Sequence, residues 1–195
     1  DRASRSAGVI SSSGVFMRPP VCGLQQLPER AACVRQLALG GPRHHAEAFD
    51  GATLARPQAD ITAALRSGGV RAVIVCPSNP FISVEPILAI PGMRDAIKAS
   101  GAPIVAVSPI IGGQAVKGPT AKMMRELGLE ASAAGVAARY GDLLDGYIVD
   151  HADADGIGNI SARVTIAKTL MTSLQDRETL ARVTLDAADA LASQR

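Results

Sequence analysis

Two polar loops in the middle of the chain contain residue types that suit phosphate binding. The first loop places Ser78 and Asn79 just after an apolar run that ends at Cys76, and Ser83 follows shortly afterwards. Hydroxyl and amide side chains next to the free backbone amides of a helix start can hold a phosphate or a ribose. The alternative is structural: Ser83 caps its helix and Asn79 supports a turn between prolines.

The second loop follows the apolar residues 104–107 and is richer in such groups. It begins with Ser108, and Gly112 and Gly113 allow the backbone to approach a ligand closely. Lys117 precedes an expected helix start, where its ammonium group could meet a phosphate. The alternative is a solvated lysine on an ordinary turn. The order of these residues is not that of a Walker A loop.

Several aspartates later in the chain raise the question of a metal site. Asp142 and Asp145 could share one helix face, and Asp150 ends an apolar run at the expected ligand edge. Residues 153–159 resemble a calcium loop only faintly, because the carboxylate that should close such a loop is missing. A solvated turn is the favoured interpretation of 153–159. The sequence assigns no metal ligand, and without a Ser-His-Asp or Cys-His order it leaves the catalytic residues unknown.

Apolar runs that alternate with amphipathic segments set the expected fold. Strands are expected at 70–76, 104–107, 146–150 and 163–167. Helices are expected at 57–67, from Ser83 or Glu85 to 90, at 93–99, 120–127 and 132–140 with an extension over 142–144, and after Ser173. This alternation predicts an α/β fold, a Rossmann-like parallel sheet with helices on both faces. Right-handed crossovers would place both polar loops at the same edge of that sheet.

The last helix has the clearest signals of all. Ser173 can cap it, and Asp176 stands three residues further on, where the reciprocal partner of a capping box is usually Glu or Gln. Apolar residues then recur on one helix face up to Leu191.

The chain divides into a poorly specified N-terminal segment, 1–56, and a better specified part, 57–195. In the first segment every basic residue other than histidine is Arg, and no period of two or 3.6 residues is sustained apart from a weak helical candidate at 27–39. Native structure, a remnant and a misread frame all stay open for this segment. The sheet is therefore expected to be incomplete at the N-terminus.

Composition excludes some classes of function. Aromatic residues make up 3% of the 195 residues, Trp is absent and the net charge is only +2, so neither base stacking nor an electrostatic nucleic-acid footprint is expected. Apolar runs are too short to cross a membrane. The three cysteines have no metal-ligand spacing and their number is odd, which favours a reducing cytoplasm. The adjacent His44 and His45 are expected to be a loop pair.

Several ordered blocks together resemble the 2-phospho-L-lactate transferase family. The resemblance runs from about residue 49 to the C-terminus and rests on residues 78–80, 83, 86–94, 106–113, 117–119, 122–124, 133–137, 140, 142, 144–145 and 169–171. It implies a transferase of coenzyme F-420 biosynthesis. Such enzymes move a phospholactyl, phosphoenolpyruvyl or phosphoglyceryl unit from a guanosine-diphosphate-activated donor to the deazaflavin Fo, and they require Mg²⁺.

The resemblance also implies where ligands bind. The nucleotide and phosphate side would be lined by Ser78, Asn79, Ser83, Ser108, Gly112, Gly113 and Lys117. A homodimer is expected by analogy, with the apolar helix at 132–140 as its surface.

Two departures from the family pattern bear on activity. Residues 1–48 match neither the Gly-Gly-rich first turn nor the Asp-containing segment of the family, and Lys168 stands where relatives place an acidic residue. Phosphoryl-type transfer depends on positioning and on charge neutralisation by metal, so this chain is expected to be inactive alone. The alternatives are a related nucleotide-binding regulatory or scaffold module without transferase activity, and a remnant without function.

Overall fold

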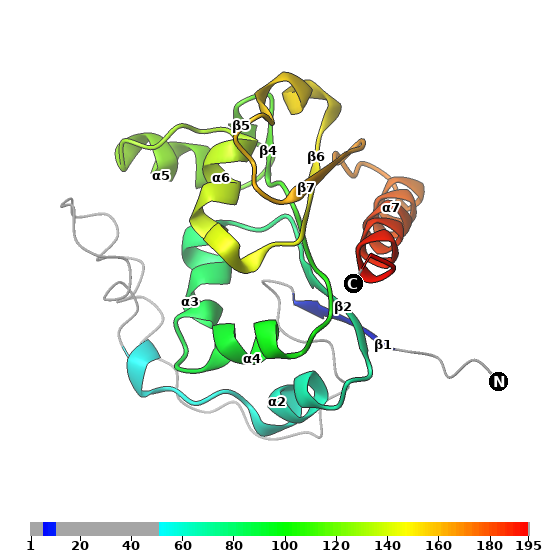
Figure 1. The fold of residues 1–195 in the computed structure, drawn as a ribbon. Helices are drawn as coiled ribbons and strands as arrows, with labels where there is room; N and C mark the ends of the chain where they lie inside the picture. Colours follow the sequence, from blue (N-terminus) through cyan, green and yellow to red (C-terminus); the bar gives the residue numbers. More distant parts are fainter. Residues whose placement is uncertain (1–5, 11–50, 195) are drawn as a thin grey trace.

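The centre of the protein is a five-stranded parallel sheet (Figure 1). The structure is a computed structural model, and it describes residues 6–10 and 51–194. Strands lie in the order β1-β2-β3-β6-β7, and a separate small hairpin pairs β4 with β5. The bounds are β1 (Ser6–Ile10), β2 (Val70–Val75), β3 (Ile104–Val107), β4 (Ile110–Ile111), β5 (Gln114–Ala115), β6 (Gly146–Val149) and β7 (Arg163–Ile166). Every pairing between neighbours in the large sheet is parallel, which confirms the predicted α/β class.

Helices fill the connections between the strands. Before β2 come η2 (Ala52–Leu54) and α2 (Ala59–Arg66). The π-helical turn η3 (Pro80–Val84), α3 (Glu85–Leu88) and α4 (Met93–Ala99) join β2 to β3. The path from β5 to β6 contains α5 (Thr120–Glu126), α6 (Ala133–Tyr140) and η4 (Gly141–Leu143). Then η5 (His151–Gly156) connects β6 to β7, and α7 (Leu174–Ala192) follows β7.

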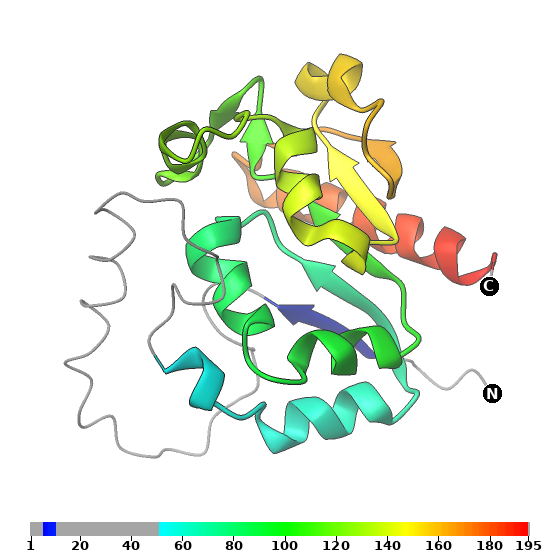
Figure 2. The ribbon, with the colours of Figure 1, turned by 60° about the vertical axis from the view of Figure 1, so that its left-hand side comes forward.

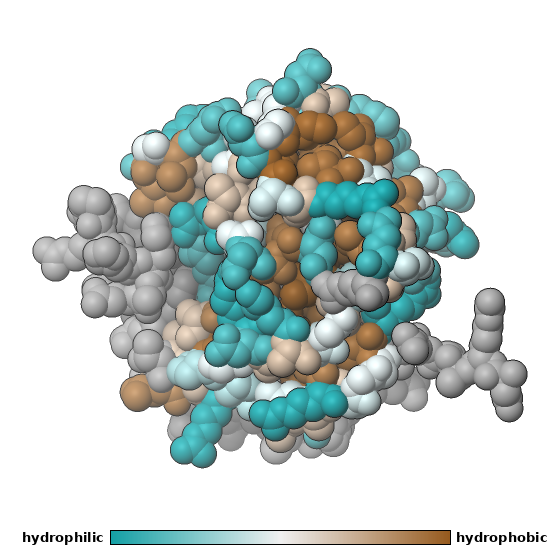
Figure 3. Space-filling view, in the orientation of Figure 1, coloured by the Kyte–Doolittle hydropathy of each residue, from teal (hydrophilic) through white to brown (hydrophobic). Residues whose placement is uncertain are grey.

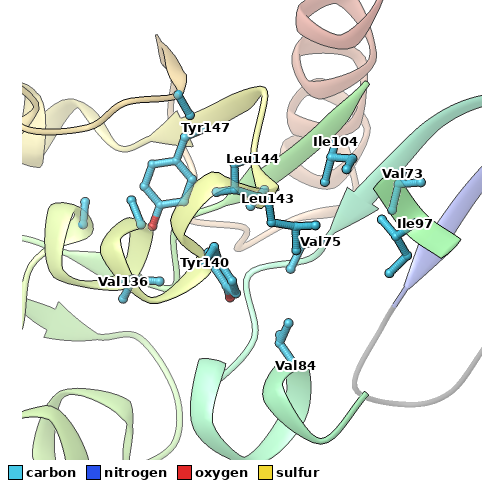
Figure 4. Packing of buried hydrophobic residues seen from close by; sticks show 14 of the residues in the cluster. Val73, Val75, Val84, Ile97, Ile104, Val136, Tyr140, Leu143, Leu144 and Tyr147 are labelled. Carbon is cyan, nitrogen blue, oxygen red and sulfur yellow. The ribbon is translucent and has the colours of Figure 1, made fainter. Parts of the chain in front are cut away.

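Both faces of the sheet are covered, because alternate residues of each central strand enter two different cores. Val73 and Val75 of β2 pack in the core that includes α4 and α6 (Figure 4). Ala72 and Ile74 face the other way, toward Leu180 of α7. A strand buried on both sides reads as a continuous apolar run, which is why 70–75 stood out in the sequence. The prediction of helices on both faces is confirmed, and Figure 2 shows α7 on the side opposite α3, α4 and α6.

Two local features allow α7 to pack closely against the sheet. The Arg71 guanidinium on β2 donates to the two carboxylate oxygens of Asp189 at 2.9 and 2.5 Å. At Gly146 on β6 an added Cβ would lie 2.9 Å from Leu191 Cδ1, so glycine allows the helix to approach this closely.

The start of α7 is the predicted capping box. Ser173 Oγ accepts from the Asp176 amide at 3.1 Å, and the Ser173 amide donates to Asp176 Oδ2 at 3.0 Å. Lys168 pairs with the other carboxylate oxygen at 2.7 Å, and this contact, with the hydrogen bonds from Thr172, lowers the pKa of Asp176. Aspartate therefore fills the place usually taken by Glu or Gln.

The described strands and helices largely confirm the expected elements, and the main differences are the following. The α-helix α3 begins at Glu85, one of the two expected starts, but the π-helical turn η3, which begins at Pro80 and is capped by Asn79, precedes it and was not predicted. The β4–β5 hairpin was not predicted. Strand β1 lies inside the segment 1–56, where no strand period was seen, and pairs with β2. The helical candidate at 27–39, His44, His45, Cys22 and Cys33 lie outside the described residues, and the boundary at 56 stays a prediction.

Candidate functional site

Polar loops meet at one edge of the sheet. Because β2, β3, β6 and β7 are parallel, the segments that follow them all leave at the carboxyl edge, in the upper part of Figure 1. The prediction that the loops after β2 and β3 share an edge is confirmed. Ligands of open α/β sheets bind outside the carboxyl ends of the strands, so this edge is the candidate site. Among the described strands the order does not reverse, so the switch point that usually locates the crevice is not defined within this part of the chain.

The loop after β2 is organised by Asn79. Its Oδ1 accepts from the amides of Phe81 at 2.9 Å and Ile82 at 3.3 Å, so it caps the helical turn η3. Its Nδ2 lies 3.5 Å from Met123 Sδ on α5, which ties this loop to the element that follows the β3 loop. The expectation of unsatisfied amides near Ser83 is therefore wrong, since Asn79 occupies the first of them and the Ser83 amide donates to Asn79 O at 3.0 Å.

Ser78 and Ser83 are half-buried side chains of the same loop. Neither hydroxyl has a hydrogen-bond partner among the residues that the structure describes, whereas the Ser78 amide donates to Cys76 O at 2.7 Å. The structural role foreseen for Ser83 as a cap is wrong, and Asn79 has that role instead. Ser78 is placed where a ligand at the carboxyl edge could reach it.

The loop after β3 begins with a serine that is committed to its own backbone. Ser108 is 2% exposed, and its hydroxyl accepts from the Ile110 amide at 3.2 Å and donates to the Ile110 carbonyl at 3.1 Å. The neighbouring Tyr147 hydroxyl, fully buried, faces Ser108 without reaching hydrogen-bond geometry to any described residue. Burial raises the pKa of Tyr147, and the Asp153 carboxylate adds to the effect. Ser108 thus shapes the loop from inside.

Gly112 and Gly113 form the turn of the β4–β5 hairpin. Their φ angles are 57° and 74°, the left-handed region that a two-residue type I′ turn requires at both positions. The Gly112 amide donates to Asp153 Oδ2 at 3.0 Å, across to the loop that follows β6. Lys117, after β5, is exposed and forms no ion pair with any residue that the structure describes.

Two aspartates of the loop after β6, Asp150 and Asp153, make contacts between loops that the sequence did not predict. Asp150 is 8% exposed and accepts from the Ala152 amide at 3.1 Å and from the Thr169 amide and hydroxyl at 2.8 and 3.0 Å. Burial works against its ionised form, but the hydrogen bonds from Thr169 and Ala152 outweigh it and lower the pKa of Asp150. Asp150 therefore joins the β6 loop to the β7 loop.

Residues 153–159 are largely exposed, as expected of a solvated turn, but the contact that Asp153 makes with another loop was not predicted. Asp153 lies half-buried on η5 and holds Gly112, whereas Asp155 on the same turn is exposed. The position of Asp150 at the end of a strand was a usable signal. Nothing in the sequence pairs Asp153 with a glycine 41 residues away.

A metal site of several protein ligands is not formed by the described part of the chain. Within residues 6–10 and 51–194, no three His, Cys, Asp or Glu side chains are grouped so that they could hold an ion. Asp142 is exposed and pairs instead with Lys98 at 2.6 Å and Arg94 at 2.8 Å, which lower its pKa to about 2. The same described residues include no helix long and apolar enough for a membrane span.

Two hollows in the structure lie away from the carboxyl edge. One, of about 90 Å³, is lined by the end of α6 and residues 159–162, which precede β7 at the amino edge of the sheet. The other lies within the apolar core between β2, α3 and α4. The α6 helix, expected as a dimer surface, buries Ala133, Val136, Ala137 and Tyr140 in the core of its own chain. Apolar side chains are exposed just beyond α5, at Leu127 and Leu129. Figure 3 shows hydrophobic surface at the upper left, over the place that α5 has in Figure 1.

The fold and this edge define a class: an α/β protein of the Rossmann-like type whose polar loops converge beyond the carboxyl ends of parallel strands. Comparison with known sequences narrows the class. Residues 36–187 match the family model of 2-phospho-L-lactate transferase CofD, and the chain belongs to that family. The match begins at residue 36, earlier than the residue near 49 that the motifs indicated.

Curated relatives support the same family. The chain is 38% identical over 143 residues to a phosphoenolpyruvate transferase of Kitasatospora aureofaciens, and the aligned part makes up 71% of this chain and 44% of the relative. It is 41% identical over 122 residues to the 2-phospho-L-lactate transferase of Methanosarcina barkeri, covering 61% and 39%. A phosphoenolpyruvate transferase of Thermobifida fusca is 46% identical over 108 residues, covering 55% and 32%. The chain thus spans less than half the length of these relatives.

Proposed function

We propose that the protein acts in the transfer reaction of coenzyme F-420 biosynthesis. The substrates would be a guanosine-diphosphate-activated three-carbon acid and the deazaflavin Fo. The Fo hydroxyl oxygen would form a bond to the phosphorus that bears the three-carbon acid, the bond from that phosphorus to the bridging oxygen of guanosine monophosphate would break, and the hydroxyl proton would pass to solvent. The products would be a phosphodiester and guanosine monophosphate. Family membership over residues 36–187 is the observation that supports this proposal most strongly.

The geometry of the carboxyl edge adds support for the nucleotide part of the proposal. Three hydrogen-bonded contacts link successive loops there: Asn79 to Met123, Gly112 to Asp153, and Asp150 to Thr169. Loops fixed to one another in this way can present phosphate-binding groups with little loss of conformational entropy on binding. Within the described part of the chain, the groups that remain available include the Ser78 and Ser83 hydroxyls and the exposed Lys117 ammonium.

Magnesium belongs to the proposal as an ion brought with the diphosphate. Mg²⁺ is often held by one or two carboxylates together with substrate phosphates and water. Because the described residues contain no three-ligand group, we assign no protein ligand and derive no step through the ion. A cytoplasmic location and a homodimer are parts of the same proposal that follow from cysteine use and from the family.

Calorimetry with the purified chain tests the proposal in two stages. The first titrates guanosine diphosphate with Mg²⁺; absence of binding would remove the nucleotide part. The second adds Fo and the activated donors with lactyl and enolpyruvyl groups, and looks for the Fo phosphodiester by mass spectrometry. Binding without product is the result expected for this chain alone, and it also fits a regulatory or scaffold module. Restoration of product by an added N-terminal half of a relative would favour the transferase.

Lys117→Ala tests the residue assigned to the phosphate. We expect the affinity for guanosine diphosphate to fall by about 1–2 kcal/mol, since a hydrogen bond to a charged group is lost. Lys122→Ala is the matched control, because Lys122 is also exposed, lies on α5 and pairs with Glu126 at 3.7 Å. Equal affinities for the two variants would place the Lys117 ammonium in solvent.

A further inference from the structure

We propose that Asp153 is a positioning residue that fixes the β4–β5 hairpin and thereby sets the affinity of the carboxyl edge for a nucleotide phosphate. The affinity part of this inference rests on the proposed function. The tether between Asp153 and Gly112 is a property of the fold and can be measured without any ligand.

The hairpin needs a tether because it is very small. Each of its strands has two residues, and an isolated hairpin of this size is not stable in water. Its base is held by Ile110, which is fully buried and packs in the main core. Its tip is exposed at Gly112, and there the structure provides one hydrogen bond to another element, from the Gly112 amide to Asp153.

Asp153 is itself held in place by hydrogen bonds within the loop after β6 and from that loop to the one after β7. The Asp153 amide donates to the Asp150 carbonyl at 3.0 Å, and the Asp150 side chain caps η5 by accepting from the Ala152 amide. Asp150 also accepts from Thr169 after β7. The carboxylate that meets Gly112 therefore belongs to a fixed frame, and a bond to a charged acceptor is stronger than one between neutral groups.

The tether determines where Lys117 lies. Lys117 follows β5 with only Val116 between them, so the path of the hairpin sets the position of the ammonium group. The Gly112 amide is already used by Asp153 and cannot also donate to a phosphate. Gly112, predicted as a ligand-contacting residue, is thus assigned to the support of the loop, and its effect on binding runs through the residues after β5.

Asp153→Asn is the test, because it preserves shape and removes the charge. Asp155→Asn on the same turn is the matched control, since Asp155 is exposed and has no hydrogen-bond partner among the described residues. In the variant at 153 we expect hydrogen exchange of the Gly112 amide to rise by about tenfold and the dissociation constant for guanosine diphosphate with Mg²⁺ to rise by about tenfold. The control should change neither by more than about twofold.

Each outcome decides a different statement. Unchanged Gly112 exchange in Asp153→Asn overturns the tether, and faster exchange with unchanged affinity overturns the positioning role. If the unsubstituted chain does not bind the nucleotide, the proposed function and the affinity part of this inference both fail, while the exchange result still decides the tether. If Asp153→Asn does not fold, the unsubstituted chain provides the test. A tether that strengthens nucleotide binding must itself be strengthened by bound nucleotide, so saturating guanosine diphosphate with Mg²⁺ must slow hydrogen exchange of the Gly112 amide. No slowing overturns the inference.

Discussion

The two roles of Asn79, helix cap and part of the proposed nucleotide edge, can be separated by two substitutions. Asn79→Ala removes the acceptor of the Phe81 and Ile82 amides at 2.9 and 3.3 Å. Loss of an N-cap side chain costs about 1 kcal/mol, and a buried amide left without a partner adds to this. Because Phe81 is 1% exposed, water does not easily replace the lost acceptor, and we expect a total of about 1–2 kcal/mol.

Asn79→Asp keeps the acceptor and adds a negative charge. Aspartate caps helices about as well as asparagine, so stability should change by less than about 0.5 kcal/mol. The charge, however, would repel a diphosphate at the carboxyl edge, so nucleotide affinity should fall while stability is retained. If nucleotide affinity falls in both variants in proportion to the loss of folding stability, Asn79 acts through folding alone.

Urea denaturation followed by circular dichroism measures the stability changes, and calorimetry measures binding. For a domain of this size, 1 kcal/mol corresponds to a shift in Tm of about 2–4 °C. Ser83→Ala is the control, since the Ser83 hydroxyl has no hydrogen-bond partner in the described part of the chain. The capping argument is refuted if Ala at position 79 costs no more than Ala at position 83.

Two further predictions concern contacts that hold the frame of the site. Arg139→Ala should lower the free energy of unfolding by about 2 kcal/mol, because the Arg139 guanidinium pairs with half-buried Glu85 and lies 4.4 Å from the centre of the Phe81 ring. Arg125→Ala is the control and should cost less than about 0.5 kcal/mol, since Arg125 is exposed. Equal losses for the two variants in urea denaturation would contradict this. Asp150→Asn should lower stability at neutral pH, and the difference from the unsubstituted chain should vanish in acid. The folded-state pKa of Asp150 is lowered, so its hydrogen bonds contribute fully above about pH 5 and are lost as the pH falls through that pKa; a difference that stays constant from pH 7 to pH 3 would disprove it.

The sheet could be predicted from the sequence because its strands are buried on both faces. In β2, neighbouring residues such as Val73 and Ile74 enter different cores, and the resulting apolar run has no other simple interpretation. Strand β1 could not be predicted in the same way, because Ser6–Ile10 lies among serines and arginines and is recognised only through its pairing with β2. A short strand with small polar neighbours lacks a period of its own.

Local chemistry was predictable where donor and acceptor are close in sequence. The capping box of Ser173 and Asp176 spans three residues and was found from spacing alone. At η3 the same logic chose Ser83, but the preceding Pro80 can begin a helix, so Asn79 became the cap. The tether from Asp153 to Gly112 joins two loops that only the order of the strands brings together, and no local pattern encodes it.

The polar residues of the carboxyl edge divide into two sets, one that fixes the loops and one that is available to a ligand. Asn79, Ser108, Asp150 and Asp153 each accept hydrogen bonds from backbone amides, so their acceptors are already used to fix the loops. The Ser78 and Ser83 hydroxyls and the Lys117 ammonium have no such partner within the described residues. Because a buried polar group that loses its partner costs about 1–3 kcal/mol, a ligand gains little by competing for the first set. Contacts with a phosphate are therefore expected from the second set, on loops whose positions the first set determines.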